Sequence, residues 1–208
     1  ALYMLGLSYY QTKVYSKAAE TLGKVTTEND ALTQNAYLHM GLSYLQLAEK
    51  NKARMAFEQA AASNANMQIK EQAAYNYALC LHETSFSAFG ESVTAFANAD
   101  FEQALKYLNQ SIAIGQYNRQ TKADAYYWCG ESYYRLNRMV EAARDFNAYL
   151  QLTTQPNNEM YALANYNLGY IAFHRKDYTQ ASNYFQKYIQ LEKGENTTAL
   201  ADAYNRIG

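Results

Sequence analysis

The sequence predicts an all-α solenoid in which antiparallel helix pairs stack on one another, and two observations carry this prediction. First, an alanine follows a glycine after twelve residues at four places: Gly6 and Ala18, Gly41 and Ala53, Gly130 and Ala142, and Gly169 and Ala181. Second, a large apolar residue stands four positions after each alanine: Leu22, Phe57, Phe146 and Phe185. Units that recur at periods of about 20 to 50 residues stack, because one such unit cannot bury its apolar face alone.

The composition agrees with a helical fold. Hydrophobic residues make up 49% of the chain, which contains only 9 glycines and a single proline, Pro156. This composition is poor in the turn signals of β architecture. Tyrosine is unusually frequent, with 22 residues, and combines a large apolar ring with a polar tip.

The recurring glycine indicates that the two helices of each pair cross closely. A glycine inside a helix costs about 1 kcal/mol relative to alanine. Its recurrence in register therefore indicates that a larger side chain is excluded. We expect Gly130 and Gly169 to face Ala142 and Ala181 at the closest approach of their hairpins.

Apolar and small residues at helical spacing define the helices in order. The expected first helices carry the stripes Leu2, Leu5, Gly6 and Tyr9; Tyr37, Met40, Gly41 and Tyr44; Ala74, Tyr77, Ala78 and Leu81; Tyr126, Cys129, Gly130 and Tyr133; and Asn165, Leu168, Gly169 and Ala172. The second helices carry Ala18, Leu22 and Val25; Ala53, Phe57 and Ala60; Ala142, Phe146 and Tyr149; and Ala181, Phe185 and Tyr188. The expected repeats span 1–30, 34–65, 70–113, 121–153 and 160–193, with a partial repeat at 198–208, in one domain over 1–208. Both ends are expected to lie inside a longer solenoid or beside disordered flanks.

One interval between repeats is anomalous. The small first-helix positions fall at 6, 41, 78, 130, 169 and 208, so the third spacing is 52 residues, whereas the others are 35 to 39. We interpret the segment from Ala99 to Leu108 as the end of a first helix, a tight turn and the start of a second helix. Half a unit is then missing, and a discontinuity or irregular connection is predicted between Phe86 and Ala97.

The order and spacing of these positions resemble the tetratricopeptide repeat, whose small, aromatic and small positions recur together as they do here. The resemblance covers nearly the whole chain, although the usual first-helix tryptophan and the closing proline are missing. It implies a right-handed superhelix of stacked helix pairs. It also implies a non-catalytic scaffold whose partners are proteins or peptides.

A second stripe on the first helices is the candidate binding site. In the tetratricopeptide family this stripe lines a concave groove that holds peptides, and the resemblance implies the same use here. The candidate groove residues are Tyr75, Tyr127, Glu131, Tyr134, Arg135, Tyr166, Tyr170, Phe173 and His174. We expect the rings from the last two complete repeats to form one patch with a polar edge, typical of a peptide hot spot.

The candidate site has one alternative interpretation, and one type of ligand contact is not expected there. In the alternative interpretation, the stripe only packs neighbouring first helices against one another. A carboxylate clamp of the family's kind is not expected, because Tyr, Leu and Glu stand where such clamps place Lys and Asn.

Charge and motifs argue against other function classes. With 18 Lys and Arg against 19 Asp and Glu, the chain lacks a nucleic-acid-binding footprint, and no apolar run is long enough to insert into a membrane. Glycine-rich phosphate loops and Gly-x-Ser-x-Gly elbows are absent. The cysteines and histidines lack metal or catalytic spacing: Cys80, Cys129, His39, His82 and His174. We therefore predict no enzyme activity, cofactor or metal.

Two alternatives to a peptide-binding scaffold stay open. The chain could be the regulatory repeat region of a larger enzyme or sensor, or a self-assembling module that forms homo-oligomers. Its richness in Asn, Gln, Tyr and Ala, with only 18% charged residues, resembles envelope-associated repeat proteins of Gram-negative bacteria. On that resemblance, a bacterial cell envelope or periplasm is favoured over the cytoplasm.

Overall fold

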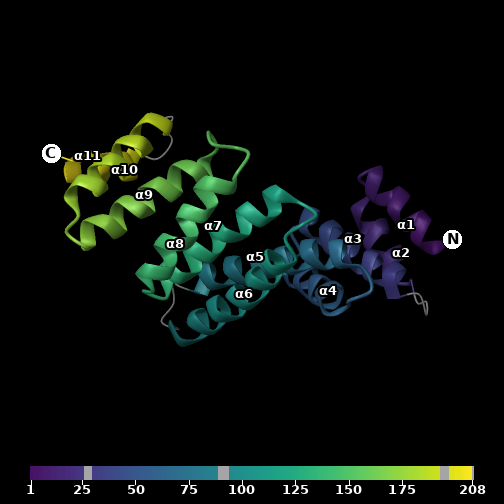
Figure 1. The fold of residues 1–208 in the computed structure, drawn as a ribbon. Helices are drawn as coiled ribbons and strands as arrows, with labels where there is room; N and C mark the ends of the chain where they lie inside the picture. Colours follow the sequence, from purple (N-terminus) through teal and green to yellow (C-terminus); the bar gives the residue numbers. More distant parts are fainter. Residues whose placement is uncertain (26–29, 89–93, 193–196, 208) are drawn as a thin grey trace. The chain divides into compact units, whose positions relative to one another are not determined.

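The computed structural model describes residues 1–25, 30–88, 94–192 and 197–207, and these form two compact units, Ala1–Thr121 and Lys122–Gly208 (Figure 1). The first unit contains α1 (Leu2–Gln11), α2 (Tyr15–Leu22), α3 (Asp30–Gln46), α4 (Lys50–Ala62), α5 (Met67–Ala88) and α6 (Thr94–Ile114). The second contains α7, which begins just before the boundary (Arg119–Arg135), α8 (Met139–Leu152), α9 (Glu159–His174), α10 (Tyr178–Leu191) and α11 (Thr197–Ile207). Within the described ranges all regular structure is helical, which confirms the predicted all-α class.

In each unit, helices that follow one another in sequence pack together, as the hairpin pattern predicts. In the first unit α1 packs on α2, and each later helix packs on the one before it through α6. In the second unit the same holds from α8 through α11, and Gly130 of α7 lies against Phe146 of α8. The core between the helices is built from the predicted alanine and aromatic positions, since Ala53, Ala142 and Ala181 are buried with the phenylalanine that follows each of them.

Gly41, Gly130 and Gly169 face aromatic rings and Gly6 faces Leu22, which corrects the prediction that Gly130 and Gly169 face alanines. A Cβ atom built on Gly130 would lie 2.7 Å from Cδ1 of Phe146, and one on Gly169 would lie 2.8 Å from Cδ1 of Phe185. Gly41 meets Phe57 at 2.6 Å in the same way. The glycine is needed because the ring of the second helix fills the place where its side chain would stand.

The turn inside each regular helix pair contains a residue in the left-handed conformation. These residues are Lys13, Ala48, Asn137 and Lys176, with φ between 58° and 63°, and each stands seven positions after the repeat glycine. At every turn the next amide donates back into the first helix, as the Glu49 amide does to the Tyr44 carbonyl at 2.9 Å. This is the hydrogen-bond pattern of a Schellman cap, which glycine or asparagine favours.

Replacing Ala48 by glycine is therefore expected to stabilise the protein. A left-handed conformation costs an L-residue roughly 1–2 kcal/mol, whereas glycine loses about 0.5–1 kcal/mol more chain entropy on folding, which leaves a gain of about 0.5–1 kcal/mol. Thermal unfolding followed by circular dichroism measures this gain. The control, Ala201→Gly at an exposed position inside α11, is expected to destabilise. A lower melting temperature for Ala48→Gly would contradict the assignment.

The anomalous interval of 52 residues arises from two long helices, and the predicted turn within it is wrong. The segment from Ala99 to Leu108 lies inside α6, which is continuous over its 21 residues, and α5 has 22 residues. Phe101, Ala104, Leu105 and Leu108 are all buried along one face of α6, so a single helix carries the apolar stripe. Of the connection predicted between Phe86 and Ala97, residues 89–93 lie outside the described residues, as does Gly208.

Candidate functional site

In the second unit, the second stripe of first-helix residues lies on α7 and α9. Hydrogen bonds connect α7 to α9 and α9 to α11, which are successive first helices. The Asn167 amide donates to the Glu131 carboxylate at 2.5 Å, which links α9 to α7. The Tyr166 hydroxyl donates to Oδ2 of Asp202 at 2.9 Å, which links α9 to α11. Each contact joins residues 36 positions apart, so the stripe packs successive first helices through its polar tips.

Two of the predicted groove residues are buried, and their assignment to an open groove is wrong. Tyr127 is 3% exposed, with its ring centroid 5.7 Å from that of Phe146 and 5.4 Å from that of Tyr149. Glu131 is 8% exposed. In the first part of α7 the stripe residues are therefore buried, because Tyr127 packs on α8 and Glu131 contacts α9.

The other stripe residues of the second unit keep part of their surface exposed. Tyr134, Tyr166, Tyr170 and Phe173 are half-buried, while Arg135 and His174 are exposed. The rings of Tyr166 and Tyr170 lie 5.8 Å apart, and the His174 ring lies 5.4 Å from that of Tyr170. We call Tyr134, Tyr170 and Phe173, with Arg135, His174 and Arg206 at their edge, the aromatic surface.

Arg206 and Asp202 are site residues that the sequence analysis missed. Nη2 of Arg206 donates to the Tyr170 hydroxyl at 2.6 Å, and its Nε donates to Oδ2 of Asp202 at 2.8 Å. The guanidinium carbon lies 4.1 Å from the ring centroid of Tyr170 and 4.8 Å from that of Phe173, within cation–π distance. The signal was present in the spacing, because Asp202 and Arg206 stand 36 residues after Tyr166 and Tyr170.

The polar network around Tyr166 holds its hydroxyl protonated. Burial raises the pKa of Tyr166, and its hydrogen bond to Asp202 raises it further. The Arg206 hydrogen bond lowers the pKa of Asp202, and the Tyr166 hydroxyl also lowers it, while partial burial opposes both. The Asp202 carboxylate is therefore charged at neutral pH, and its interactions hold α11 against α9.

Glu131 is the opposite case, a carboxylate whose charge is disfavoured. Burial raises the pKa of Glu131, while Arg135 and the Asn167 hydrogen bond lower it in part. Nε of Arg135 lies 3.8 Å from the carboxylate. The pKa of Glu131 is therefore higher in the folded state than in the unfolded state. The contribution of this carboxyl group to stability is present below the unfolded pKa and is lost as the pH rises through the folded pKa.

Glu131→Gln is expected to raise the melting temperature at about pH 7.5 but not at about pH 4. The amide removes the buried charge and keeps an oxygen that can accept from Asn167. Thermal unfolding of both proteins at several pH values measures the effect. The control is Glu141→Gln, since the half-buried Glu141 accepts from Arg138 and its pKa is lowered, chiefly by a backbone hydrogen bond and then by Arg138. This control should not gain stability at the higher pH, and a pH-independent effect at Glu131 would contradict the reasoning.

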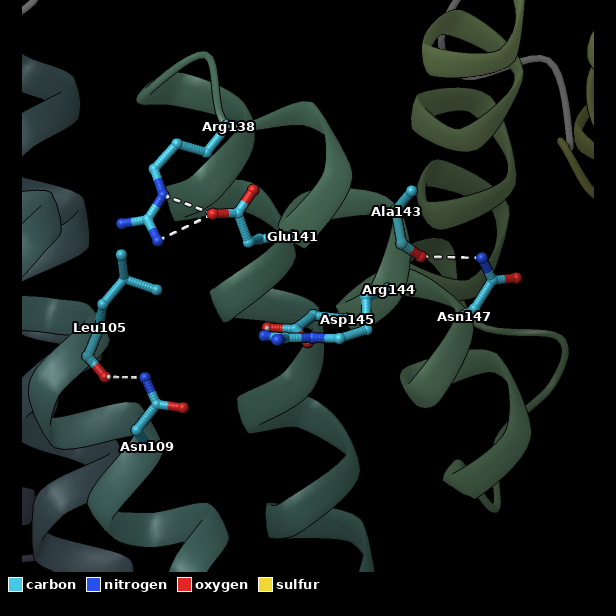
Figure 2. A network of polar contacts seen from close by, with 8 residues as sticks. All are labelled: Leu105, Asn109, Arg138, Glu141, Ala143, Arg144, Asp145 and Asn147. Atoms are coloured by element: carbon cyan, nitrogen blue, oxygen red, sulfur yellow. Dashed lines mark hydrogen bonds and ion pairs between the residues drawn. The ribbon is translucent and has the colours of Figure 1, made fainter. Parts of the chain in front are cut away.

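The second helices carry polar contacts that support the fold rather than a site. Arg138 pairs with Glu141 at 2.9 Å, as Figure 2 shows. Arg144 of α8 donates twice to the buried Asp145. The Asn147 amide donates to the Ala143 carbonyl at 2.8 Å. Its oxygen accepts from Tyr184 of α10 at 3.2 Å, so successive second helices are also joined by polar tips.

In the first unit, Tyr75 is half-buried on α5. A groove of about 350 Å³ lies between α3 and α4 and was not predicted. It is lined by Tyr37, Met40, Tyr44, Lys52, Met55, Ala56, Glu58 and Gln59. Its residues belong to both helices of one pair, so it is distinct from the predicted first-helix stripe.

The described residues contain no group of three or more His, Cys, Asp or Glu side chains that could hold a metal ion. Both cysteines are buried thiols. Burial raises the pKa of the Cys80 thiol to about 11 and raises that of Cys129 as well, so neither is the thiolate that nucleophilic chemistry needs. A search of the described helices found none that is both long and apolar enough to cross a membrane.

Comparisons with known proteins agree with the helix-pair architecture. Family models of the tetratricopeptide repeat match residues 1–29, 34–67, 89–159 and 162–194. No curated protein sequence matches significantly.

Among solved structures, YrrB is 18% identical with a TM-score of 0.71, and the match covers 98% of this chain and 90% of that one. MamA from Desulfovibrio magneticus RS-1 is 17% identical with a TM-score of 0.67 over 94% of this chain and 98% of that one. MamA AMB-1 is 18% identical with a TM-score of 0.65 over 92% and 96%. These likenesses show the fold, and with the family matches they establish that the chain belongs to the tetratricopeptide repeat family.

Proposed function

We propose that this chain is a non-catalytic scaffold that binds a peptide segment of a protein partner at the aromatic surface. The observation that carries the proposal is the set of partly exposed rings, Tyr134, Tyr170 and Phe173, whose edge is basic and polar. Rigid aromatic side chains with a polar rim are typical of binding hot spots. A protein of similar fold also supports the proposal of a peptide ligand, since YrrB is described as a TPR protein with an unusual peptide-binding site.

The contacts within the surface favour a preformed site. Arg206 stacks on Tyr170 and Phe173 and donates to the Tyr170 hydroxyl. These interactions hold the rings in place before a partner arrives, so that little side-chain entropy is lost on binding. The half-buried state of the rings is consistent with a shallow groove, in which one face of each ring packs on the protein and the other receives a ligand.

Tyr134→Ala is expected to weaken peptide binding about tenfold, the effect of removing a hot-spot ring. Tyr134 is chosen because Tyr170 also holds Arg206, whereas within the described part of the chain the Tyr134 hydroxyl forms no hydrogen bond to another helix. The probe is a peptide selected from a random library displayed on phage, with affinity measured by fluorescence anisotropy. The control is Tyr117→Ala, which removes a tyrosine that is 45% exposed in the first unit.

Circular dichroism of each variant checks that helical content is unchanged. Equal affinity of the parent and Tyr134→Ala for every selected peptide would contradict the proposed site. Loss of affinity in Tyr117→Ala instead would place binding on the first unit.

A further inference from the structure

Three basic side chains form the edge of the aromatic surface. Arg135 ends α7, His174 ends α9, and Arg206 lies in the last turn of α11. Burial and then Tyr170 raise the pKa of Tyr134, whereas both Arg135 and Arg206 lower it, so both positive charges act at its hydroxyl. The surface therefore brings cationic groups to the place where the rings are partly exposed.

A carboxylate lies beside each of the two arginines, Glu131 beside Arg135 and Asp202 beside Arg206. Burial raises the pKa of Glu131, so its charged form is disfavoured, and it lies 3.8 Å from Arg135. Asp202 is charged but accepts hydrogen bonds from both Tyr166 and Arg206. Arg135 and Arg206 thus place two guanidinium groups beside the partly exposed rings, and a guanidinium group is complementary to an anion such as a carboxylate.

Arg206 is the most precisely placed of the three. Its side chain is 21% exposed, and stacking on Tyr170 and Phe173 fixes the plane of the guanidinium group. The hydrogen bonds to Asp202 and Tyr170 use its Nε and Nη2 atoms, and a guanidinium carries more N–H donors than these two contacts use. A planar group held in this way is suited to a carboxylate, which it can bind through directed hydrogen bonds.

We propose that the partner segment presents an aspartate or glutamate side chain to Arg206, with an adjacent apolar or aromatic residue packed on Tyr134 and Tyr170. The partner is thus an acidic peptide with an apolar anchor. This inference rests on the proposed function, because it names the chemistry of the ligand at the same surface.

The test uses the same phage-displayed library selected against the full 208-residue chain. Selected peptides should be enriched in Asp or Glu next to an apolar residue. One such peptide is then synthesised in its acidic form and with that residue changed to the matching amide, Glu to Gln or Asp to Asn. On the parent protein the amide form is expected to bind about tenfold more weakly, the loss typical of a charge-assisted contact.

Arg206→Met removes the guanidinium and keeps an apolar stem, and it should bind both peptide forms with nearly equal affinity. Lys187→Met is the matched control, since it removes an exposed positive charge from α10 and should preserve the difference between the two forms. The comparison of peptides on the parent protein does not depend on how any variant folds.

The outcomes separate the two proposals. Tyr134-dependent binding in which the acidic and amide peptides bind the parent equally would overturn the acidic-partner inference and leave the proposed function standing. An unchanged difference in Arg206→Met would also overturn it, because another group would then hold the carboxylate. Selection that yields no Tyr134-dependent peptide would overturn both.

Discussion

Gly169→Leu is expected to destabilise the second unit by about 3 kcal/mol or more, because overpacking a filled core forces side chains and backbone apart. Even a Cβ atom at this position would lie 2.8 Å from both Cδ1 and Cε1 of Phe185, and Phe185 is fully buried. The ring has no exposed side toward which it can move. Chemical unfolding followed by circular dichroism measures the loss.

The control for this substitution is Ala201→Leu, which adds a side chain at an exposed position of α11 in the same unit. It should change the free energy of unfolding by no more than about 0.5 kcal/mol. If the two variants were equally stable, the ring of Phe185 would not be the group that excludes side chains at Gly169.

Phe185→Ala is the second substitution expected to have a large effect, with a loss of about 3–5 kcal/mol for a fully buried aromatic residue. The Phe185 ring also lies 5.9 Å from the Tyr166 ring, so its removal leaves a cavity beneath the stripe as well as over Gly169. Unfolding in denaturant gives the free energy, provided that the transition stays cooperative.

Combining the two changes tests the contact itself. In the double variant the leucine at position 169 can enter the space that the ring occupied, so the combined loss should be smaller than the sum of the separate losses. Additive losses would show that the glycine and the ring act independently, and the explanation of the repeat glycine would be wrong.

The sequence predicted the helix pairs well because the repeat glycine and a large buried apolar residue sixteen positions later recur together. It did not predict which atoms meet at the glycine, because that depends on how the helices cross. The left-handed turn residues show a related limit. Asn137 favours that conformation, but Lys13, Ala48 and Lys176 do not, so the packed helices on either side must hold it.

The turn predicted inside the long helix pair α5 and α6 was wrong for a similar reason. The segment from Ala99 to Leu108 was predicted to contain a tight turn before a second helix, and Asp100 is of a residue type that favours helix N-termini. The buried stripe that includes Phe101, Ala104 and Leu108 keeps the chain helical after this point. Tertiary burial thus outweighs a local capping preference.

The candidate stripe of the second unit lies on the first helices α7 and α9, but the sequence could not show which of its residues pack against neighbouring helices and which stay partly exposed. Tyr127 and Glu131 face inward, Tyr166 and Tyr170 contact α11, and Tyr134 keeps part of its surface exposed. Helical spacing gives the face of one helix and does not show which residues the next helix covers. The contacts of α11 show that Arg206 is part of the surface, although its spacing of 36 residues from Tyr170 was a signal in the sequence.

Amide hydrogen exchange with and without a selected peptide tests the proposed binding surface most directly. We expect the peptide to slow exchange at the C-terminal ends of α7 and α9 and in α11, around Tyr134, Phe173 and Arg206, with the second helices α8 and α10 unchanged. Protection confined to the first unit, or to α8 and α10, would contradict the assignment of partner binding to the aromatic surface.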